Sequence, residues 1–264
     1  MELIDLNGKL FPAVGFGAFE MDTESAEKYV SDALSMGYRI IETSQLYDNE
    51  KGVGNAIRRS GIPREEIYVI DKVFVYHESW RYDATRENID KSLMNLGLDY
   101  IDFMFPHQTV GNRYEANCAI GDAIKEGKVK GMNIGDFNPD IDIDRIKENQ
   151  GGSLYELDLE DMNWSPTSYP SKTARFCNET VRGIANIYHK CIGQIVLRYL
   201  NQLDFVAITK ATTKEHLRMN LDIFDFNLTE KEMNDIQLSL QISEDKAIMS
   251  DRKLIKMFDD LRKQ

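Results

Sequence analysis

Short apolar runs alternate with longer segments of helical periodicity along most of this 264-residue chain. Alternation of this kind predicts a parallel sheet whose strands are joined by crossover helices. At this length the chain could form one α/β barrel, one doubly wound domain or two small domains. Counting units gives about eight βα repeats, which favours a (β/α)8 barrel. Strands are expected near 38–43, 67–72, 101–105, 129–134 and 205–208, and helices near 22–37, 51–60, 84–96, 114–126, 141–147, 178–188 and 192–200.

The two ends of the chain carry further signals. Asn7-Gly8 between alternating apolar residues predicts an N-terminal β-hairpin, and the apolar run 13–16 that follows predicts the first barrel strand. Thr212 with Glu215, and Thr229 with Glu232, have the spacing of capping boxes at helix starts. The segment 251–263 is typical of an amphipathic terminal helix. With no linker or low-complexity stretch in between, we expect one barrel domain spanning 1–264.

Charge and cysteine content narrow the classes of function. The formal net charge of −12 at pH 7 argues against nucleic acid as a partner and against a polybasic membrane anchor. We find neither a signal segment nor a long apolar run, and the three cysteines are widely spaced, without a CxxC pair. A cytoplasmic protein without structural disulfides is therefore expected. No metal site is predicted, because the acidic run at 140–144 lacks the glycine and the terminal glutamate of a calcium loop.

Ionisable side chains follow three consecutive predicted strands. Glu42 and Tyr47 come after the second strand, Lys72 ends the third, and His107 follows the fourth. In a (β/α)8 barrel the carboxyl ends of the strands form the reactive face. A lysine cation lowers the pKa of a nearby tyrosine, a carboxylate keeps that lysine charged, and a neutral histidine can orient a carbonyl oxygen. Each residue alone is more often structural, but the set predicts one acid–base site.

Ordered motifs along nearly the whole chain strengthen this interpretation and resemble the aldo-keto reductase family, in particular bacterial diketogulonate-reductase-like enzymes. The motifs are Gly-Tyr-Arg-Ile-Ile-Glu-Thr-Ser-Gln-Leu-Tyr-Asp-Asn-Glu (37–50), Gly52-Val53-Gly54, Leu-Gly-Leu-Asp-Tyr-Ile-Asp (96–102), Glu-Gly-Lys-Val-Lys (126–130), Phe137-Asn138-Pro139, Trp164-Ser165-Pro166, Gln-Ile-Val-Leu-Arg-Tyr-Leu (194–200) and Asn-Leu-Asp-Ile-Phe-Asp-Phe (220–226).

The resemblance implies a catalytic tetrad and a nicotinamide cofactor. The family usually uses NADPH, and NADH remains an alternative. Tyr47 would be the general acid, Lys72 its pKa modulator, His107 the group that orients the carbonyl, and Glu42 the carboxylate of the tetrad. The resemblance also implies a set of cofactor contacts. These are Trp164 stacked on the nicotinamide, Ser165 and Lys210 at the phosphates, and Asn220 at the adenine.

Several positions depart from the family pattern. Glu42 replaces an aspartate, which would move the carboxylate by roughly 1.5 Å on an unchanged backbone. Gly135-Asp136 replaces a Ser-Asn pair, so Asp136 can accept from the carboxamide of the cofactor but cannot donate to it. His216 stands in place of an arginine that would contact the 2′-phosphate. The span 138–163 is short, which leaves room for an irregular or partly open barrel around strands 6–7.

The predicted function is the reduction of a small aldehyde or ketone to an alcohol with NADPH or NADH. Two alternatives follow from the departures at the cofactor positions. One is a non-redox acid–base enzyme that catalyses elimination or isomerisation, and the other is a binding protein that has lost catalysis. The sequence identifies neither the substrate nor the oligomeric state.

Overall fold

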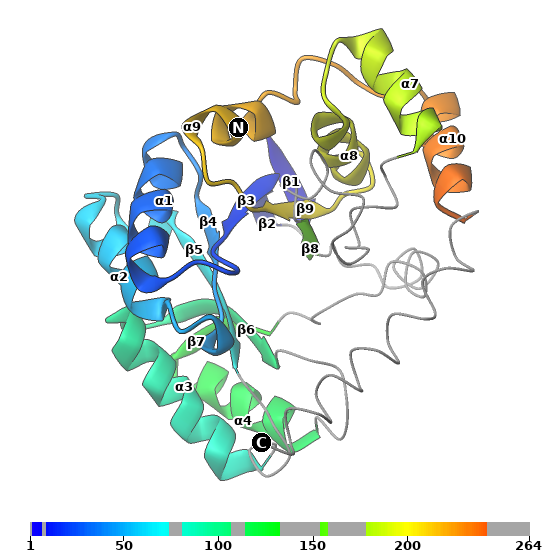
Figure 1. Ribbon diagram of the computed structural model, residues 1–264. Coiled ribbons are helices and arrows are strands. Elements are labelled where there is room, and N and C mark those ends of the chain that lie inside the picture. The colour runs from blue at the N-terminus through cyan, green and yellow to red at the C-terminus, as the bar shows by residue number, and fades with distance from the viewer. Residues whose placement is uncertain are drawn as a thin grey trace, which may run out of the picture.

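The computed structural model describes residues 2–6, 9–73, 81–106, 114–132, 154–157 and 178–241. Its centre is a curved sheet of parallel strands in the order β7-β6-β5-β4-β3-β9-β8 (Figure 1). From β3 to β7, each strand lies beside the next one along the chain, as in a (β/α)8 barrel, and the predicted α/β fold class is confirmed. The strands are β3 (Val14–Gly17), β4 (Ile40–Glu42), β5 (Tyr68–Val73), β6 (Ile101–Pro106), β7 (Val129–Gly131), β8 (Leu154–Leu157) and β9 (Val206–Thr209).

Helices cover the outer side of this sheet (Figure 1). They are α1 (Thr23–Ser35), α2 (Glu50–Arg59), α3 (Tyr82–Leu96), α4 (Tyr114–Lys125), α7 (Glu179–Tyr188), α8 (Ile192–Asn201), α9 (Lys214–Leu221) and α10 (Glu230–Gln241), with short 3-10 turns η1 (Gln45–Tyr47) and η2 (Arg64–Glu66). The start of α10 confirms the capping box, since Thr229 and Glu232 exchange hydrogen bonds. The start of α9 differs by one residue from the prediction, because Thr213 rather than Thr212 accepts from the His216 N–H.

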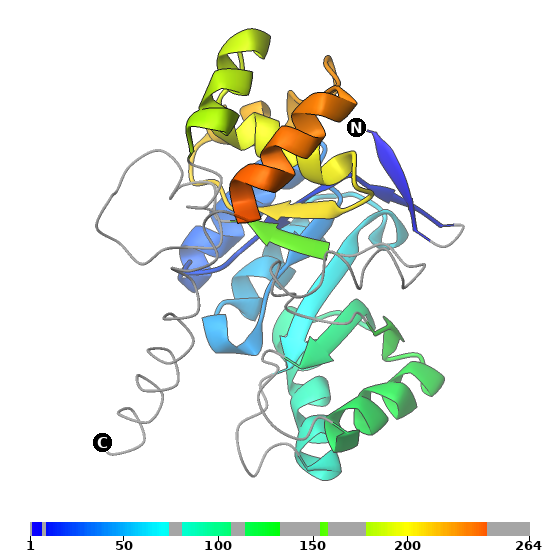
Figure 2. The same cartoon turned by 90° about the vertical axis from the view of Figure 1, so that its right-hand side faces the viewer.

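The predicted hairpin is present as β1 (Leu3–Leu6) and β2 (Lys9–Pro12), which pair antiparallel. It lies at one end of the sheet (Figure 2). The ring of Phe11 packs 4.9 Å from that of Tyr68 and 5.6 Å from that of Phe103. Tyr68 is the first residue of β5, so the hairpin packs against the amino-terminal end of the strands and leaves the carboxyl ends to the functional residues.

Two glycines explain why α2 lies so close to its neighbours. A Cβ at Gly52 would come 2.0 Å from the Thr23 carbonyl oxygen of α1, and one at Gly54 would come 1.9 Å from the Leu96 carbonyl oxygen of α3. Only glycine allows backbones to approach this closely. The motif Gly52-Val53-Gly54 therefore fixes the position of α2 between α1 and α3, and with it the position of Glu50 at the start of α2.

The core consists of side chains on both faces of the strands. All four residues of β3 and all four of β9 are buried, which is expected of parallel strands that have helices on one face and the barrel interior on the other. Among the described helices, none is long and apolar enough to cross a membrane. The helices predicted at 141–147 and 251–263 lie outside the described residues. Of the span 138–163, where an irregular barrel was expected, the structure describes only β8, which pairs parallel with β9.

Candidate functional site

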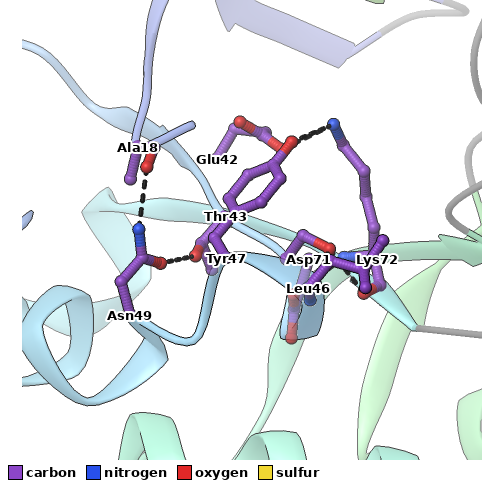
Figure 3. A network of polar contacts seen from close by, with 9 residues as sticks. Ala18, Glu42, Thr43, Leu46, Tyr47, Asn49, Asp71 and Lys72 are labelled. Carbon is purple, nitrogen blue, oxygen red and sulfur yellow. Dashed lines mark hydrogen bonds and ion pairs between the residues drawn. The ribbon is translucent and has the colours of Figure 1, made fainter. Parts of the chain in front are cut away.

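Three of the four predicted catalytic side chains meet at the carboxyl ends of neighbouring strands (Figure 3). Glu42 is the last residue of β4, Lys72 lies near the end of β5, and Tyr47 ends the turn η1. The Lys72 Nζ atom lies 2.8 Å from Glu42 Oε1 and donates a hydrogen bond of 2.8 Å to the Tyr47 hydroxyl oxygen. The Tyr47 hydroxyl itself lies 3.4 Å from Glu42 Oε1. One ammonium group therefore bridges a carboxylate and a phenol.

The ion pair between Lys72 and Glu42 is almost completely shielded from water. Their side chains are 3% and 2% exposed. Removing two charges from water is costly, and a buried pair survives only when each charge has a close partner of opposite sign. The pair therefore keeps a cation fixed beside the Tyr47 oxygen, and little water can screen its field.

A glycine on the adjacent strand makes room for the longer side chain of Glu42. Gly17, the last residue of β3, lies opposite Glu42 in the parallel register. A Cβ added at Gly17 would lie 3.0 Å from Glu42 Oε2 and 3.1 Å from Ile208 Cγ2. The carboxylate of Glu42 thus lies beside the bare backbone of Gly17, and any larger residue at position 17 would reduce the space for that carboxylate. With that space, its carboxylate forms the Lys72 ion pair despite the extra methylene.

The turn that carries Tyr47 is held at both ends by buried polar groups. The Ser44 hydroxyl accepts from the Leu46 N–H and donates to the Lys72 carbonyl oxygen. Asn49 accepts from the Thr43 hydroxyl at 2.7 Å, and its Nδ2 donates to the Ala18 carbonyl oxygen at 2.8 Å (Figure 3). These bonds fasten η1 to β5 on one side and to the segment after β3 on the other. Tyr47 is therefore placed by backbone contacts as well as by Lys72.

Phe19 and Glu20, which lie shortly after β3, connect the cluster of Glu42, Tyr47 and Lys72 with Lys210. The Phe19 ring lies 5.1 Å from the Tyr47 ring in an edge-on arrangement, and the Lys210 ammonium lies 5.8 Å from the centre of the Phe19 ring. Lys210 also forms an ion pair of 3.2 Å with Glu20. Phe19 and Glu20 were not among the site residues predicted from the sequence. Their only sequence signal was their place directly after the first barrel strand, where functional side chains occur.

The predicted cofactor residues that are described lie at β9 and α9. Lys210 directly follows β9, and its side chain is 12% exposed. His216 lies in the first half of α9 and is partly buried. Asn220 is buried near the end of α9, beside the Tyr38 hydroxyl, and its Nδ2 has no well-placed acceptor among the described residues. Buried donors rarely remain without an acceptor, so an acceptor from a ligand would fit there.

The other predicted site residues lie outside the described residues, namely His107, Asp136, Trp164 and Ser165. Within the described part of the chain, no group of three or more His, Cys, Asp or Glu side chains is arranged to hold a metal ion. A buried acidic pair was also missed by the sequence analysis. Asp71 and Glu50 lie between the sheet and its helices, and the signal was a carboxylate within a strand that is buried along most of its length.

Comparisons with known proteins agree with this geometry. Residues 13–165, more than half of the chain, match the model of the Aldo/keto reductase family. An aldo-keto reductase of Mycolicibacterium smegmatis is 31% identical over 256 residues, which cover 88% of this chain and 91% of the relative.

Solved structures give the same result. An aldo-keto reductase of Bombyx mori in complex with NADP superimposes with a TM-score of 0.70 at 28% identity, covering 90% of this chain and 92% of that one. A structure described as a 2,5-diketo-D-gluconic acid reductase B gives a TM-score of 0.73 at 26% identity, covering 90% of this chain and 91% of that one. The predicted likeness to diketogulonate-reductase-like enzymes is therefore confirmed.

Proposed function

The chain belongs to the aldo/keto reductase family, whose members are NAD(P)-dependent oxidoreductases, and we propose that it reduces a small aldehyde or ketone with Tyr47 as the general acid. The observation that carries the proposal is the Lys72 ammonium 2.8 Å from the Tyr47 hydroxyl oxygen. As a phenol releases its proton, negative charge develops on that oxygen. A fixed ammonium at hydrogen-bond distance stabilises this charge and so makes the tyrosine a better acid.

The described residues fit a nicotinamide nucleotide. Lys210 supplies a cation at a strand end, where phosphates can be reached, and Asn220 supplies an unused amide donor at the position expected for adenine. When bound, the reduced nicotinamide supplies the hydride for the carbonyl carbon. Outside the described residues, Trp164, Ser165 and Asp136 would complete this site, as the family resemblance implies.

The roles of the remaining groups follow from their distances. Glu42 holds the Lys72 ammonium in place, so that the cation does not turn away when the phenol is neutral. Tyr47 would donate its proton to the carbonyl oxygen as negative charge develops there, which would leave an alcohol and a phenolate. The phenolate then recovers a proton from solvent. We assign the orientation of the carbonyl oxygen to His107.

The substitution Tyr47→Phe tests this assignment, because it removes the proton and keeps the ring against Phe19. Methylglyoxal is a suitable probe, since it carries both an aldehyde and a ketone. We expect the rate of NADPH oxidation to fall by about 10²–10⁴-fold, the usual contribution of a general acid. NADPH affinity, measured by fluorescence titration, should stay within about two-fold, since Lys210 and Asn220 are untouched.

The control is Tyr29→Phe on α1, whose tyrosine lies outside the cluster and which should keep the wild-type rate. Unchanged turnover in Tyr47→Phe would contradict the role of Tyr47. A wild-type protein that binds neither NADPH nor NADH would instead favour a non-redox acid–base enzyme or a binding protein.

A further inference from the structure

A pair of buried carboxyl groups lies directly behind Lys72. Asp71 precedes Lys72 in β5, and because strand residues alternate between the two faces of a sheet, it faces the helices while Lys72 faces the barrel interior. Asp71 is 0% exposed, and Glu50 of α2, its partner, is 4% exposed. Neither belongs to the cluster of Glu42, Tyr47 and Lys72. A pair of acids without a cation needs a physical reason to persist in the core.

The contacts of the pair show how it is satisfied. Asp71 Oδ1 accepts from the Lys72 N–H at 2.8 Å, and Glu50 Oε2 accepts from the Asn95 side-chain amide at 2.8 Å. The other oxygens, Asp71 Oδ2 and Glu50 Oε1, receive no donor from the described residues. Two ionised carboxylates can only accept. Two ionised carboxylates at this distance would therefore repel each other, whereas a single proton shared between Asp71 and Glu50 allows a hydrogen bond.

The surroundings decide which of the two acids holds the proton. Glu50 is the first residue of α2, where the helix dipole favours a negative charge. Asp71 does not lie at a helix N-terminus. Burial together with the nearby Glu50 raises the pKa of Asp71 well above its usual range. In the described part of the chain, the side chains that act on Asp71 are Glu50 from α2 and Ser92 from α3, and neither is cationic. We therefore assign the proton to Asp71.

The pair also reaches the turn that carries Tyr47. The Ser92 side chain interacts with Asp71, and its hydroxyl accepts from Gln45 Nε2 at 3.0 Å. Gln45 donates a second bond of 2.7 Å to the Asn88 carbonyl oxygen, and it is the first residue of η1, which ends at Tyr47. A set of polar contacts, partly buried at Gln45, thus runs from the backbone of Lys72 through α3 to the turn of Tyr47.

We infer that Asp71 is a positioning residue for the Tyr47–Lys72 pair, and that it acts through a proton shared with Glu50. The inference rests on the proposed function, because Tyr47 and Lys72 are taken to be the reacting and supporting groups. Asp71 touches neither substrate nor cofactor. It fixes the backbone of Lys72 on one side and, through Ser92 and Gln45, the turn of Tyr47 on the other, and so maintains their separation of 2.8 Å.

The substitution Asp71→Asn tests the inference, since its amide can accept from the Lys72 N–H and donate to Glu50 without needing a proton. We expect Asp71→Asn to keep kcat for methylglyoxal within about two-fold of wild type. Asp71→Ala removes both bonds and should lower kcat by at least about ten-fold with KM nearly unchanged, since small displacements in a preorganised site are costly. Recovery of kcat in the asparagine variant separates positioning from a general loss of packing.

A second comparison locates the proton even if Asp71→Ala does not fold. Glu50→Gln removes the negative charge from the helix N-terminus beside Asp71 and should lower the thermal midpoint by at least about 5 °C, whereas Asp71→Asn should not. The matched control is Asp102→Asn, which breaks a carboxylate's ion pair with Arg64 at the other end of the sheet. It should lower the midpoint and leave kcat unchanged.

The outcomes separate the two proposals. If Asp71→Ala keeps wild-type kcat while Tyr47→Phe loses turnover, the inference about Asp71 is overturned and the proposed function stands. If Asp71→Asn lowers the midpoint as much as Asp102→Asn does, the shared proton is overturned. If Tyr47→Phe keeps turnover, the proposed function fails and the positioning role fails with it, while the midpoints still locate the proton.

Discussion

The acid–base cluster of Glu42, Tyr47 and Lys72 and the ion pair of Glu20 with Lys210 lie at the same face of the barrel but differ in their exposure to water. Glu42 and Lys72 are both buried, whereas the Glu20 side chain is 62% exposed. A buried pair depends strongly on each partner, while a pair open to water is worth about 0–1 kcal/mol. We therefore expect substitutions in the cluster of Glu42, Tyr47 and Lys72 to have large effects, and substitutions in the pair of Glu20 and Lys210 to have small ones.

The largest effect should come from breaking the buried ion pair of Lys72 and Glu42. Lys72→Met leaves the Glu42 carboxylate without its cation inside the barrel, and we expect the free energy of unfolding to fall by about 3–5 kcal/mol. Turnover should fall by at least about 100-fold as well, since the developing charge on Tyr47 loses its partner. Urea unfolding and steady-state kinetics measure the two effects.

Lys125→Met is the matched control, because it breaks an ion pair with Asp122 on the surface of α4. Its cost should stay below about 0.5 kcal/mol. A similar loss in both variants would contradict the view that burial separates the two regions.

The next effect is a pH dependence of stability that arises from the buried acids. The pKa of Asp71 is raised from its ordinary 3.8, so above about pH 4 the folded chain keeps a proton that the unfolded chain has lost. The free energy of unfolding should therefore decrease as pH rises toward the raised pKa, by at most about 1.4 kcal/mol per pH unit. Asp71→Asn removes this contribution, and its stability relative to wild type should grow between about pH 5 and about pH 8.

Urea titrations of the two proteins at matched pH values measure that difference directly, since every other group titrates in both. A constant difference across the range would show that Asp71 is not protonated in the folded chain.

The smallest effect should come from breaking the partly exposed ion pair of Glu20 and Lys210. Glu20→Gln releases Lys210 from its carboxylate partner and removes a negative charge near the predicted phosphate site. We expect NADPH to bind about two- to five-fold more tightly, in keeping with a partly exposed ion pair. Fluorescence titration gives the Kd. Glu24→Gln, the same charge change at an exposed position of α1, serves as the control, and equal Kd values for the two variants would refute a specific role for Glu20.

The structure brings Glu42, Tyr47 and Lys72 together, as their positions near the ends of consecutive predicted strands suggested. Glu42, Tyr47 and Lys72 could be grouped once the barrel was predicted, since parallel strands bring their carboxyl ends together. The bounds of most helices also agree within one or two residues, because Asp22, Asn178 and Thr229 are strong N-terminal signals. Local chemistry determines these features, and local chemistry can be inferred from a single sequence.

Contacts between distant segments could not be inferred in the same way. Glu20 and Lys210 are 190 positions apart, and only the pairing of β3 with β9 brings them together. Asp71 looked like an ordinary polar residue of a strand, because its partner Glu50 lies on a helix whose depth depends on the close approach at Gly52 and Gly54. Such contacts depend on the packing between elements, which the pattern within each element does not specify.

The contact between Gly17 and Glu42 limits which substitutions this chain can accept at positions 17 and 42. With glutamate at position 42, an alanine at position 17 would press its methyl group against the carboxylate and Ile208. With the shorter aspartate at position 42, the same alanine would be relieved of the contact with the carboxylate and would keep only the contact with Ile208. The two positions are therefore expected to vary together among descendants of this chain, so that each substitution is tolerated or rejected according to which of them is acquired first.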